Sequence, residues 1–139
     1  MVEVIRDATI STDLGATNCK LITWSSLDSD DSGQPVFIPT YSDKCVQIGG
    51  TFGVGGSVTI YGSNDVAAVR ADIAAGTLFG SATAEWVALT DAQGNALTKT
   101  AAAIEQILEN PAYICPVVTA GDGSTSLEVM LLAKLTEVR

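Results

Sequence analysis

Hydrophobic and polar residues alternate along much of the chain, with the period of two that is typical of β-strands buried on one face. The clearest stretch is residues 126–138, in which Glu128, Lys134 and Thr136 stand on the polar side. Met130 and Leu132 interrupt that polar side, so we expect a second strand or a neighbouring subunit to cover part of it. The apolar side consists of Leu127, Val129, Leu131, Ala133 and Leu135.

Other segments of the chain have the same strand character, because they are short, rich in β-branched and aromatic residues, and separated by glycine, serine and aspartate turns. Gly94 and Asn95 are suited to the left-handed backbone of a hairpin turn over residues 91–95. The pattern predicts an all-β fold, a jelly-roll-like β-sandwich, in one domain over residues 1–139. The predicted strands are residues 20–26, 36–40, 44–48, 57–62, 86–90, 96–100 and 112–119.

Two segments have helical character, so we expect one or two short helices inserted between the strands. Residues 65–75 are helix formers that follow a possible cap at Asn64 or Asp65 and end at Gly76. Residues 100–109 precede Pro111 and fit either a helical turn or two or the continuation of a strand from Ala96.

The charge of the chain disfavours several classes of partner. The formal net charge is −9 over 139 residues, so the field repels nucleic acid backbones and anionic membrane surfaces. The first ten residues carry charges within their apolar stretch and do not resemble a signal peptide. No apolar run approaches the roughly 18 residues of a membrane span. We therefore expect a protein made in the cytoplasm that binds neither nucleic acid nor membrane.

The chain contains no histidine, which excludes Ser-His-Asp triads, Cys-His pairs and histidine-based metal sites. Cys19, Cys45 and Cys115 are far apart and odd in number, so buried free thiols are favoured over a disulfide framework. We interpret the carboxylate pairs Asp30/Asp31 and Glu105/Glu109 as solvated surface charge. The sequence therefore predicts a protein that is not an enzyme and needs no cofactor.

Two loops superficially match ligand-binding motifs. Asp28, Asp30 and Ser32, with Gly33, match the opening of a calcium loop, but Pro39 occupies the twelfth position, where a bidentate glutamate belongs. We expect a solvated acidic loop there, and any bound ion to be weak. The glycine-rich residues 49–56 lack the Lys-Ser/Thr of a phosphate-binding loop, so they predict a turn or bulge that lets a partner's backbone approach closely.

The segments GSVTIYGSND (56–65) and EWVALTDAQGN (85–95) resemble a stretch of discoidin-type galactose-binding jelly rolls. The glycine of the family's motif after Asp65 is missing here, and about twenty residues separate the turn from Trp86. This resemblance implies a carbohydrate-binding module in which Trp86 or Tyr61 stacks on a sugar ring.

A longer resemblance covers roughly the last two thirds of the chain. The same block is followed by ENPAYICPVVTAGDGSTSLEVMLLAKL (109–135), and this order is similar to small virion proteins of tailed bacteriophages. The resemblance implies a head decoration, or cement, protein on the capsid exterior. Its implied partners are the major capsid protein and further copies of itself, as a homotrimer. A tail tube or head-completion component is the alternative within the same class.

A decoration protein contacts the shell through chain ends and flexible loops, which predicts a set of interface residues. The alternative interpretation of residues 2–10 is that they simply form the first strand. The predicted interface residues are Val2, Val4, Ile5, Ile10, Gly53, Val54 and Gly55.

Overall fold

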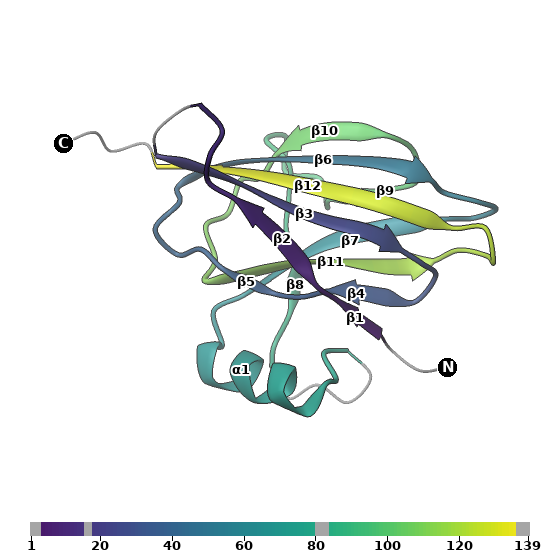
Figure 1. The fold of residues 1–139 in the computed structure, drawn as a ribbon, viewed down its shortest axis with the longest axis horizontal. Helices are drawn as coiled ribbons and strands as arrows, with labels where there is room; N and C mark the ends of the chain where they lie inside the picture. The colour runs from purple at the N-terminus through teal and green to yellow at the C-terminus, as the bar shows by residue number, and fades with distance from the viewer. Residues whose placement is uncertain (1–3, 16–17, 80–83, 136–139) are drawn as a thin grey trace.

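The computed structural model describes residues 4–15, 18–79 and 84–135, and these form two β-sheets packed face to face (Figure 1). The order of the first sheet is β1-β4-β11-β7-β8, with β5 also paired to β11 and β9 to β7. Its strands are β1 (Val4–Arg6), β4 (Asp31–Gly33), β5 (Val36–Phe37), β7 (Ser57–Ser63), β8 (Val87–Ala88), β9 (Thr98–Lys99) and β11 (Tyr113–Ala120).

The second sheet has the order β10-β6-β12-β3-β2. Its strands are β2 (Ala8–Ser11), β3 (Cys19–Leu27), β6 (Asp43–Thr51), β10 (Ala103–Gln106) and β12 (Ser126–Lys134). Strand β12 lies at its centre, so Leu131 faces Ile22 on one side and Val46 on the other. The prediction of an all-β sandwich is confirmed.

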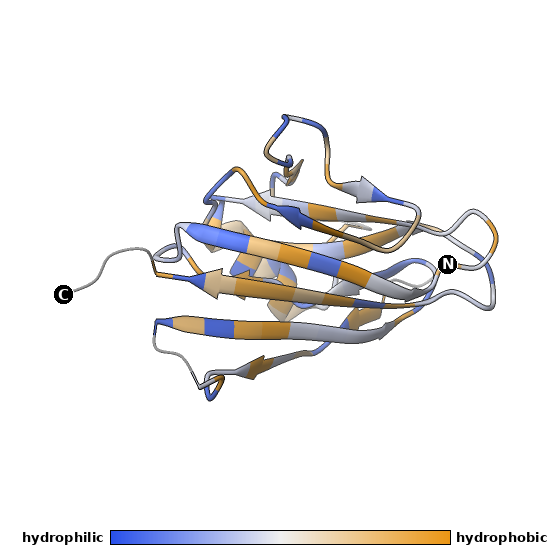
Figure 2. Ribbon diagram, turned by 90° about the horizontal axis from the view of Figure 1, so that it is seen from above, coloured by the Kyte–Doolittle hydropathy of each residue, from blue (hydrophilic) through white to orange (hydrophobic). Residues whose placement is uncertain are grey.

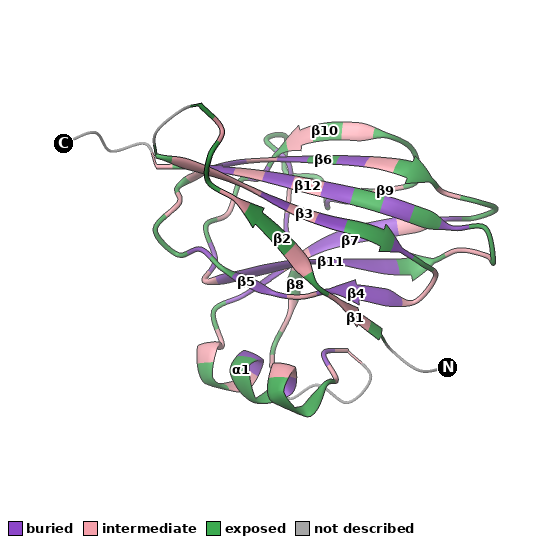
Figure 3. Ribbon diagram, in the orientation of Figure 1, coloured by how far each residue is buried: buried purple, intermediate pink, exposed green. Residues whose placement is uncertain are grey.

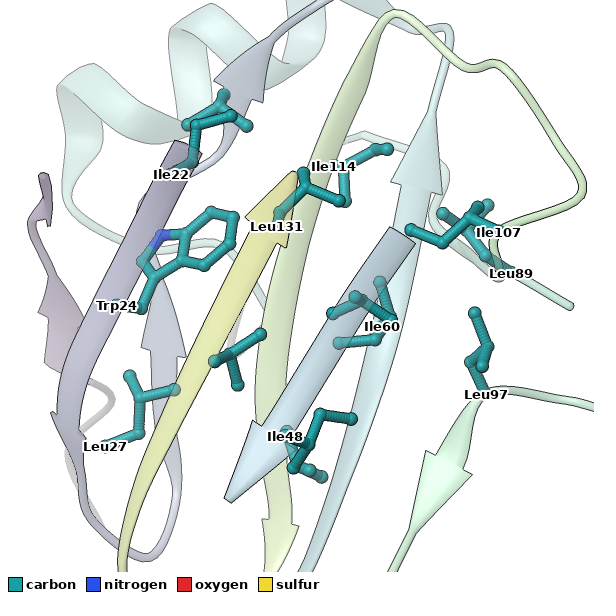
Figure 4. Close-up of a cluster of buried hydrophobic side chains, with 14 of the residues drawn as sticks. Ile22, Trp24, Leu27, Ile48, Ile60, Leu89, Leu97, Ile107, Ile114 and Leu131 are labelled. Carbon is teal, nitrogen blue, oxygen red and sulfur yellow. The ribbon is translucent and has the colours of Figure 1, made fainter. Parts of the chain in front are cut away.

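The alternating pattern places one face of each sheet in a shared core, as the colours of the strands show in Figures 2 and 3. Side chains from both sheets point into the space between them in Figure 4, among them Trp24 and Leu131 from the second sheet and Ile60 and Ile114 from the first. Trp24 is only 1% exposed, and its indole N–H donates a 3.0 Å hydrogen bond to the carbonyl of Gln34. The core therefore joins the two sheets and also anchors the connection between β4 and β5.

The helix α1 (Val66–Ala75) confirms the prediction for residues 65–75 and lies to one side of the sandwich (Figure 1). It ends at Gly76, whose φ of 77° lets its N–H bond to the carbonyls of Asp72 and Ile73. At the other end Asp65 occupies the cap position, but its side chain makes no capping hydrogen bond.

The prediction of a helix over residues 100–109 is wrong, because this segment contains the strand β10. Ala103 pairs with Ile48 of β6, and the N–H of Ile107 bonds to the carbonyl of Lys44. Pairing with a long neighbouring strand outweighs the helix propensity of the alanines, which is a weak preference per residue. The chain therefore has one inserted helix in its described residues.

Several predicted strands are shorter in the structure. Residues 36–40 contain only β5, residues 86–90 only β8, and residues 96–100 only β9. In the 91–95 hairpin Gly94 has the expected positive φ of 85°, whereas Asn95 does not adopt one. The Asp91 side chain stabilises the turn instead, because its carboxylate accepts hydrogen bonds from the N–H groups of Gln93 and Asn95. The side chain of the first turn residue thus holds the loop.

Among the described residues no cysteine forms a disulfide, and only one of the three is buried as predicted. Cys115 is buried, whereas Cys19 and Cys45 are half-buried. Burial raises the pKa of the Cys45 thiol. No helix of the described residues is long and apolar enough to cross a membrane.

Candidate interaction surfaces

The loop between β6 and β7 presents Val54 at its tip, with 82% of its surface exposed. Gly53 and Gly55 on either side both have a φ of 71°, a conformation that side-chain-bearing residues rarely adopt. The glycines predicted to form part of an interface therefore shape a turn that carries one exposed aliphatic side chain.

Hydrogen bonds attach this loop to the turn of residues 121–125. The N–H of Val54 donates to Asp122 Oδ2 over 2.9 Å, and the hydroxyl of Thr125 donates to the carbonyl of Phe52 over 2.8 Å. Asp122 Oδ1 accepts the hydroxyl and N–H of Ser124. The bonds from Ser124 and from the Val54 N–H lower the pKa of Asp122 to about 2. The glycine loop is thus held in place by a neighbouring carboxylate.

Substituting Asp122 with asparagine is expected to loosen the Val54 loop, because the amide is a weaker acceptor than the carboxylate. Since folding lowers the pKa of Asp122 from 3.8 to about 2, the ionised form supports the fold above pH 4. That support is lost as the pH falls toward 2. The protection factor of the Val54 amide, which compares its exchange rate with that of an unstructured amide at the same pH, should fall on acidification in the wild type and be low already at pH 6 in D122N. Equal protection in both proteins would contradict this prediction.

The predicted N-terminal contact segment forms two short strands that belong to different sheets. Strand β1 pairs in parallel with β4, and β2 pairs antiparallel with β3, so the chain crosses from one sheet to the other at Asp7. Val4 is 41% exposed and Ile10 is 54% exposed, while Ile5 is half-buried. Val2 lies outside the described residues. The segment is therefore strand, as the alternative interpretation proposed, and still exposes aliphatic side chains.

The acidic loop that opens like a calcium motif binds a side chain of the protein itself. Arg6 Nε donates to Asp31 Oδ2 over 2.6 Å, and Arg6 Nη2 lies 3.2 Å from Asp28 Oδ2. Asp31 is 4% exposed and also accepts the N–H of Asp28. Asp30 has a positive φ of 68°, and Ser32 is buried in β4. Sequence patterns did not single out Arg6, the cation that occupies this loop.

Among the described residues, no three histidine, cysteine, aspartate or glutamate side chains gather where they could hold a metal ion. Arg6 instead connects β1 to the start of β4 through Asp31 and to the residue after β3 through Asp28.

Trp86 and Tyr61, the predicted sugar-stacking residues, belong to one aromatic cluster with Phe79. The ring centroids of Tyr61 and Phe79 are 5.1 Å apart, and those of Phe79 and Trp86 are 5.4 Å apart. Trp86 and Tyr61 are both half-buried. Both predicted stacking residues therefore pack against the ring of Phe79.

A cleft of about 430 Å³ lies where β7 ends, between the start of α1, strand β8 and residues 109–111. Such a volume falls within the usual range of ligand-binding clefts, roughly 300–1,000 Å³. Leu89, Pro111 and Val87 supply apolar lining, and Asp65, Glu85 and Glu109 supply carboxylates. No sequence motif predicted this cleft, because its walls come from three separate segments.

The walls of the cleft are tied together by hydrogen bonds. Asn64 Oδ1 accepts the N–H of Ala112 over 2.8 Å, and Glu109 accepts both the N–H and the hydroxyl of Thr90. Burial disfavours ionised Glu109, but the bonds from Thr90 outweigh it and lower the pKa of Glu109. The hydrogen bonds thus hold the walls of the cleft together, and those from Thr90 favour the ionised form of Glu109.

The outer face of the second sheet carries the residues that interrupt the alternation in β12. Leu132 faces Leu21 and Cys45 on the adjacent strands, and all three are half-buried. Met130, also half-buried, faces Thr23 and Gln47. Coverage of this face by a neighbouring subunit stays a prediction.

Comparisons with known proteins find similarity in fold only. No family model matches the chain, and no curated protein matches it. Among solved structures, the SPBc2 prophage-derived protein YomS matches with a TM-score of 0.54 and 10% sequence identity. The match covers 85% of this chain and 96% of YomS. At this identity it shows that the two proteins share a fold.

Two further solved structures are similar at a lower level. IMPa from Pseudomonas aeruginosa, solved with an O-glycopeptide, has a TM-score of 0.41 and 7% identity, over 92% of this chain and 13% of IMPa. A carbohydrate-binding module of Cellvibrio mixtus lichenase 5A, solved with cellotriose, has a TM-score of 0.31 and 15% identity, over 94% of this chain and 86% of the module. Neither similarity is close enough to support an argument about this chain.

Proposed function

We propose that this chain is a structural protein of a tailed-bacteriophage particle, and specifically a decoration protein on the outside of the capsid. The observation that carries this proposal is the fold shared with YomS, a prophage-derived protein, over nearly the whole length of both chains. The resemblance of residues 56–135 to small virion proteins points in the same direction. The protein is then made in the host cytoplasm and works on the virion exterior, with the major capsid protein and its own copies as partners.

The exposed aliphatic side chains suit a protein that works by binding other proteins. Val54 stands on a loop that Asp122 holds in place, so little loop entropy is lost when it contacts a partner. Val4 and Ile10 are exposed on strands rather than on free chain. Burying such side chains across subunit boundaries stabilises the assembled lattice, because the protein binds the lattice in preference to the loose subunits. This role needs no catalytic group.

The proposal predicts that the purified protein sediments with expanded heads of its phage, and that Val54→Asp weakens this attachment about tenfold or more. Ile104→Asp is the matched control, because Ile104 is a 64% exposed aliphatic residue far along the chain, on β10. Both variants should melt like the wild type. Sedimentation of bound protein and electron cryomicroscopy of the heads measure occupancy and location.

Three outcomes would contradict this function. A wild-type protein that never sediments with heads and stays monomeric would exclude decoration. Rings or tubes of the purified protein would favour a tail or head-completion component. Saturable binding to a glycan array that depends on Trp86 would favour carbohydrate recognition.

A further inference from the structure

The cleft beside the start of α1 holds two carboxylates for which the described chain supplies no cation. Asp65 is half-buried at the cap position of the helix, yet its side chain makes no capping hydrogen bond and lines the cleft instead. An aspartate at this position ordinarily bonds to the first helical N–H groups, and losing that bond costs about 1 kcal/mol. Glu85, which precedes β8, is exposed and also lines the cleft.

The basic side chains of the described residues are all engaged elsewhere. Arg139, the last of the chain's 7 lysines and arginines, lies outside the described residues. The others pair as follows: Arg6 with Asp31, Lys20 with the ring of Tyr41, Lys44 with Asn110 and the Tyr41 carbonyl, Arg70 with the Tyr113 hydroxyl, Lys99 with Glu105, and Lys134 with Asp43. Lys44 bonds to Asn110 and its charge acts on Glu109 at the cleft, but none of these six cations pairs with Asp65 or Glu85.

The residues that line the cleft favour a peptide with a basic and an aliphatic side chain over a single ion or a sugar. Within the described residues the three carboxylates of the cleft do not form a group that could hold one metal ion. Among the described residues no aromatic ring lines the cleft, so they provide no flat surface on which a sugar could stack. Its floor is aliphatic and close-packed, since a Cβ added at Gly62 would stand 2.6 Å from Leu89 Cδ2 and 2.7 Å from Pro111 Cγ.

We propose that this cleft receives an extended segment of a partner protein that carries a lysine or arginine beside an aliphatic residue. The cation lies between Asp65 and Glu85, and the aliphatic side chain packs on Leu89 and Pro111. Val87, which is 68% exposed at the edge strand β8, adds apolar surface beside the cleft. Glu109 remains ionised in its bonds with Thr90 and adds negative potential at the floor.

This inference rests on the proposed function for one point only, the identity of the partner. If the protein decorates capsids, the partner is a segment of the capsid shell. The cleft chemistry itself requires just a basic, partly apolar peptide. A chain of net charge −9 attracts such a segment over a distance of about one Debye length, roughly 8 Å at physiological salt, and the apolar floor then retains it.

The test is a titration of the isotope-labelled full chain with a short capped peptide of sequence Ala-Val-Lys-Val-Ala, followed by amide chemical shifts. We expect shifts at Gly62, Ser63, Asp65 and Val87, saturable and weakened by raising sodium chloride. The same peptide with glutamate in place of lysine should produce none. The double variant D65N/E85Q should bind the lysine peptide about tenfold more weakly. It should melt like the wild type, because Asp65 does not cap the helix.

The matched control is D13N/E128Q, which removes the same two charges from exposed positions away from the cleft. It should bind the lysine peptide with unchanged affinity. Equal weakening in both double variants would mean that only net charge matters, and would overturn the inference. Equal binding of the two peptides, or chemical shift changes confined to other residues, would also overturn it. If no amide shifts change at all, the carboxylates are simply solvated and the inference is wrong.

Sedimentation with phage heads separates this inference from the proposed function. If the wild type attaches to heads and D65N/E85Q attaches equally well, the function stands and the cleft has no part in it. If the lysine peptide binds in a carboxylate-dependent way but the wild type does not attach to heads, the cleft specificity stands and decoration is wrong.

Discussion

Trp24→Ala is expected to lower the free energy of unfolding by about 3–5 kcal/mol, the usual cost of removing a buried aromatic side chain. Trp24 is 1% exposed and lies within the core between the two sheets (Figure 4). The substitution leaves a large cavity and also removes the hydrogen bond to the carbonyl of Gln34. Because small domains are stable by only about 5–15 kcal/mol, this one change should remove much of the total. Chemical denaturation followed by circular dichroism measures it.

Two control variants separate the causes of that loss. Trp24→Phe keeps most of the apolar volume but not the indole N–H, so we expect a smaller loss of about 1–3 kcal/mol. Val54→Ala changes a side chain that is 82% exposed and should alter stability by less than about 0.5 kcal/mol. A Trp24→Ala protein as stable as Val54→Ala would show that the two sheets do not depend on this contact.

The fold could be predicted from the sequence where a single segment carries its own pattern. The alternation in β12 survives because the strand lies between β3 and β6 and is buried on one face along its length. The helix α1 was equally visible, since it has helix formers and a terminal glycine. Both signals are local, and the structure preserves local signals when nothing competes with them.

Prediction failed where a distant segment decided the outcome. The alanines of residues 100–103 favour a helix, but β6 offers a ladder of unpaired backbone groups and β10 pairs with it. Strand β4 was hidden in an acidic, serine-rich loop, because Asp31 is buried there by its contact with Arg6, 25 residues away. Long-range pairing of this kind leaves no periodic trace in the sequence.

The candidate surfaces likewise divide into those with a local sequence signal and those formed by distant segments. Val54 could be predicted, because glycines on both sides of one aliphatic residue indicate an exposed turn. The cleft at Asp65 and Glu85 could not, because its walls come from segments that are adjacent only in three dimensions. One local signal was present, since Asn64 or Asp65 was predicted as the helix cap. Only the structure shows that Asp65 occupies the cap position without a capping hydrogen bond from its side chain.

Arg6→Met is expected to lower the free energy of unfolding by about 2–4 kcal/mol, because it leaves the carboxylate of Asp31 buried without its cation. The value lies below the usual cost of breaking a fully buried pair, since the Arg6 side chain is 38% exposed and Asp31 keeps the N–H of Asp28. The protection of the β1 amides from hydrogen exchange should also decrease in Arg6→Met, because Arg6 is the last residue of that strand.

A second substitution tests whether the buried charge is the cause. Adding Asp31→Asn to the Arg6→Met protein replaces the unpaired carboxylate with a neutral amide and should restore at least about 1 kcal/mol, although Asp31→Asn alone destabilises the wild type. Lys134→Met is the matched control, because the Lys134–Asp43 pair is 3.5 Å long and exposed, and removing it should cost less than about 1 kcal/mol. If Arg6→Met costs no more than Lys134→Met, and Asp31→Asn restores nothing, water reaches Asp31 and the first strand is held by its backbone pairing with β4 alone.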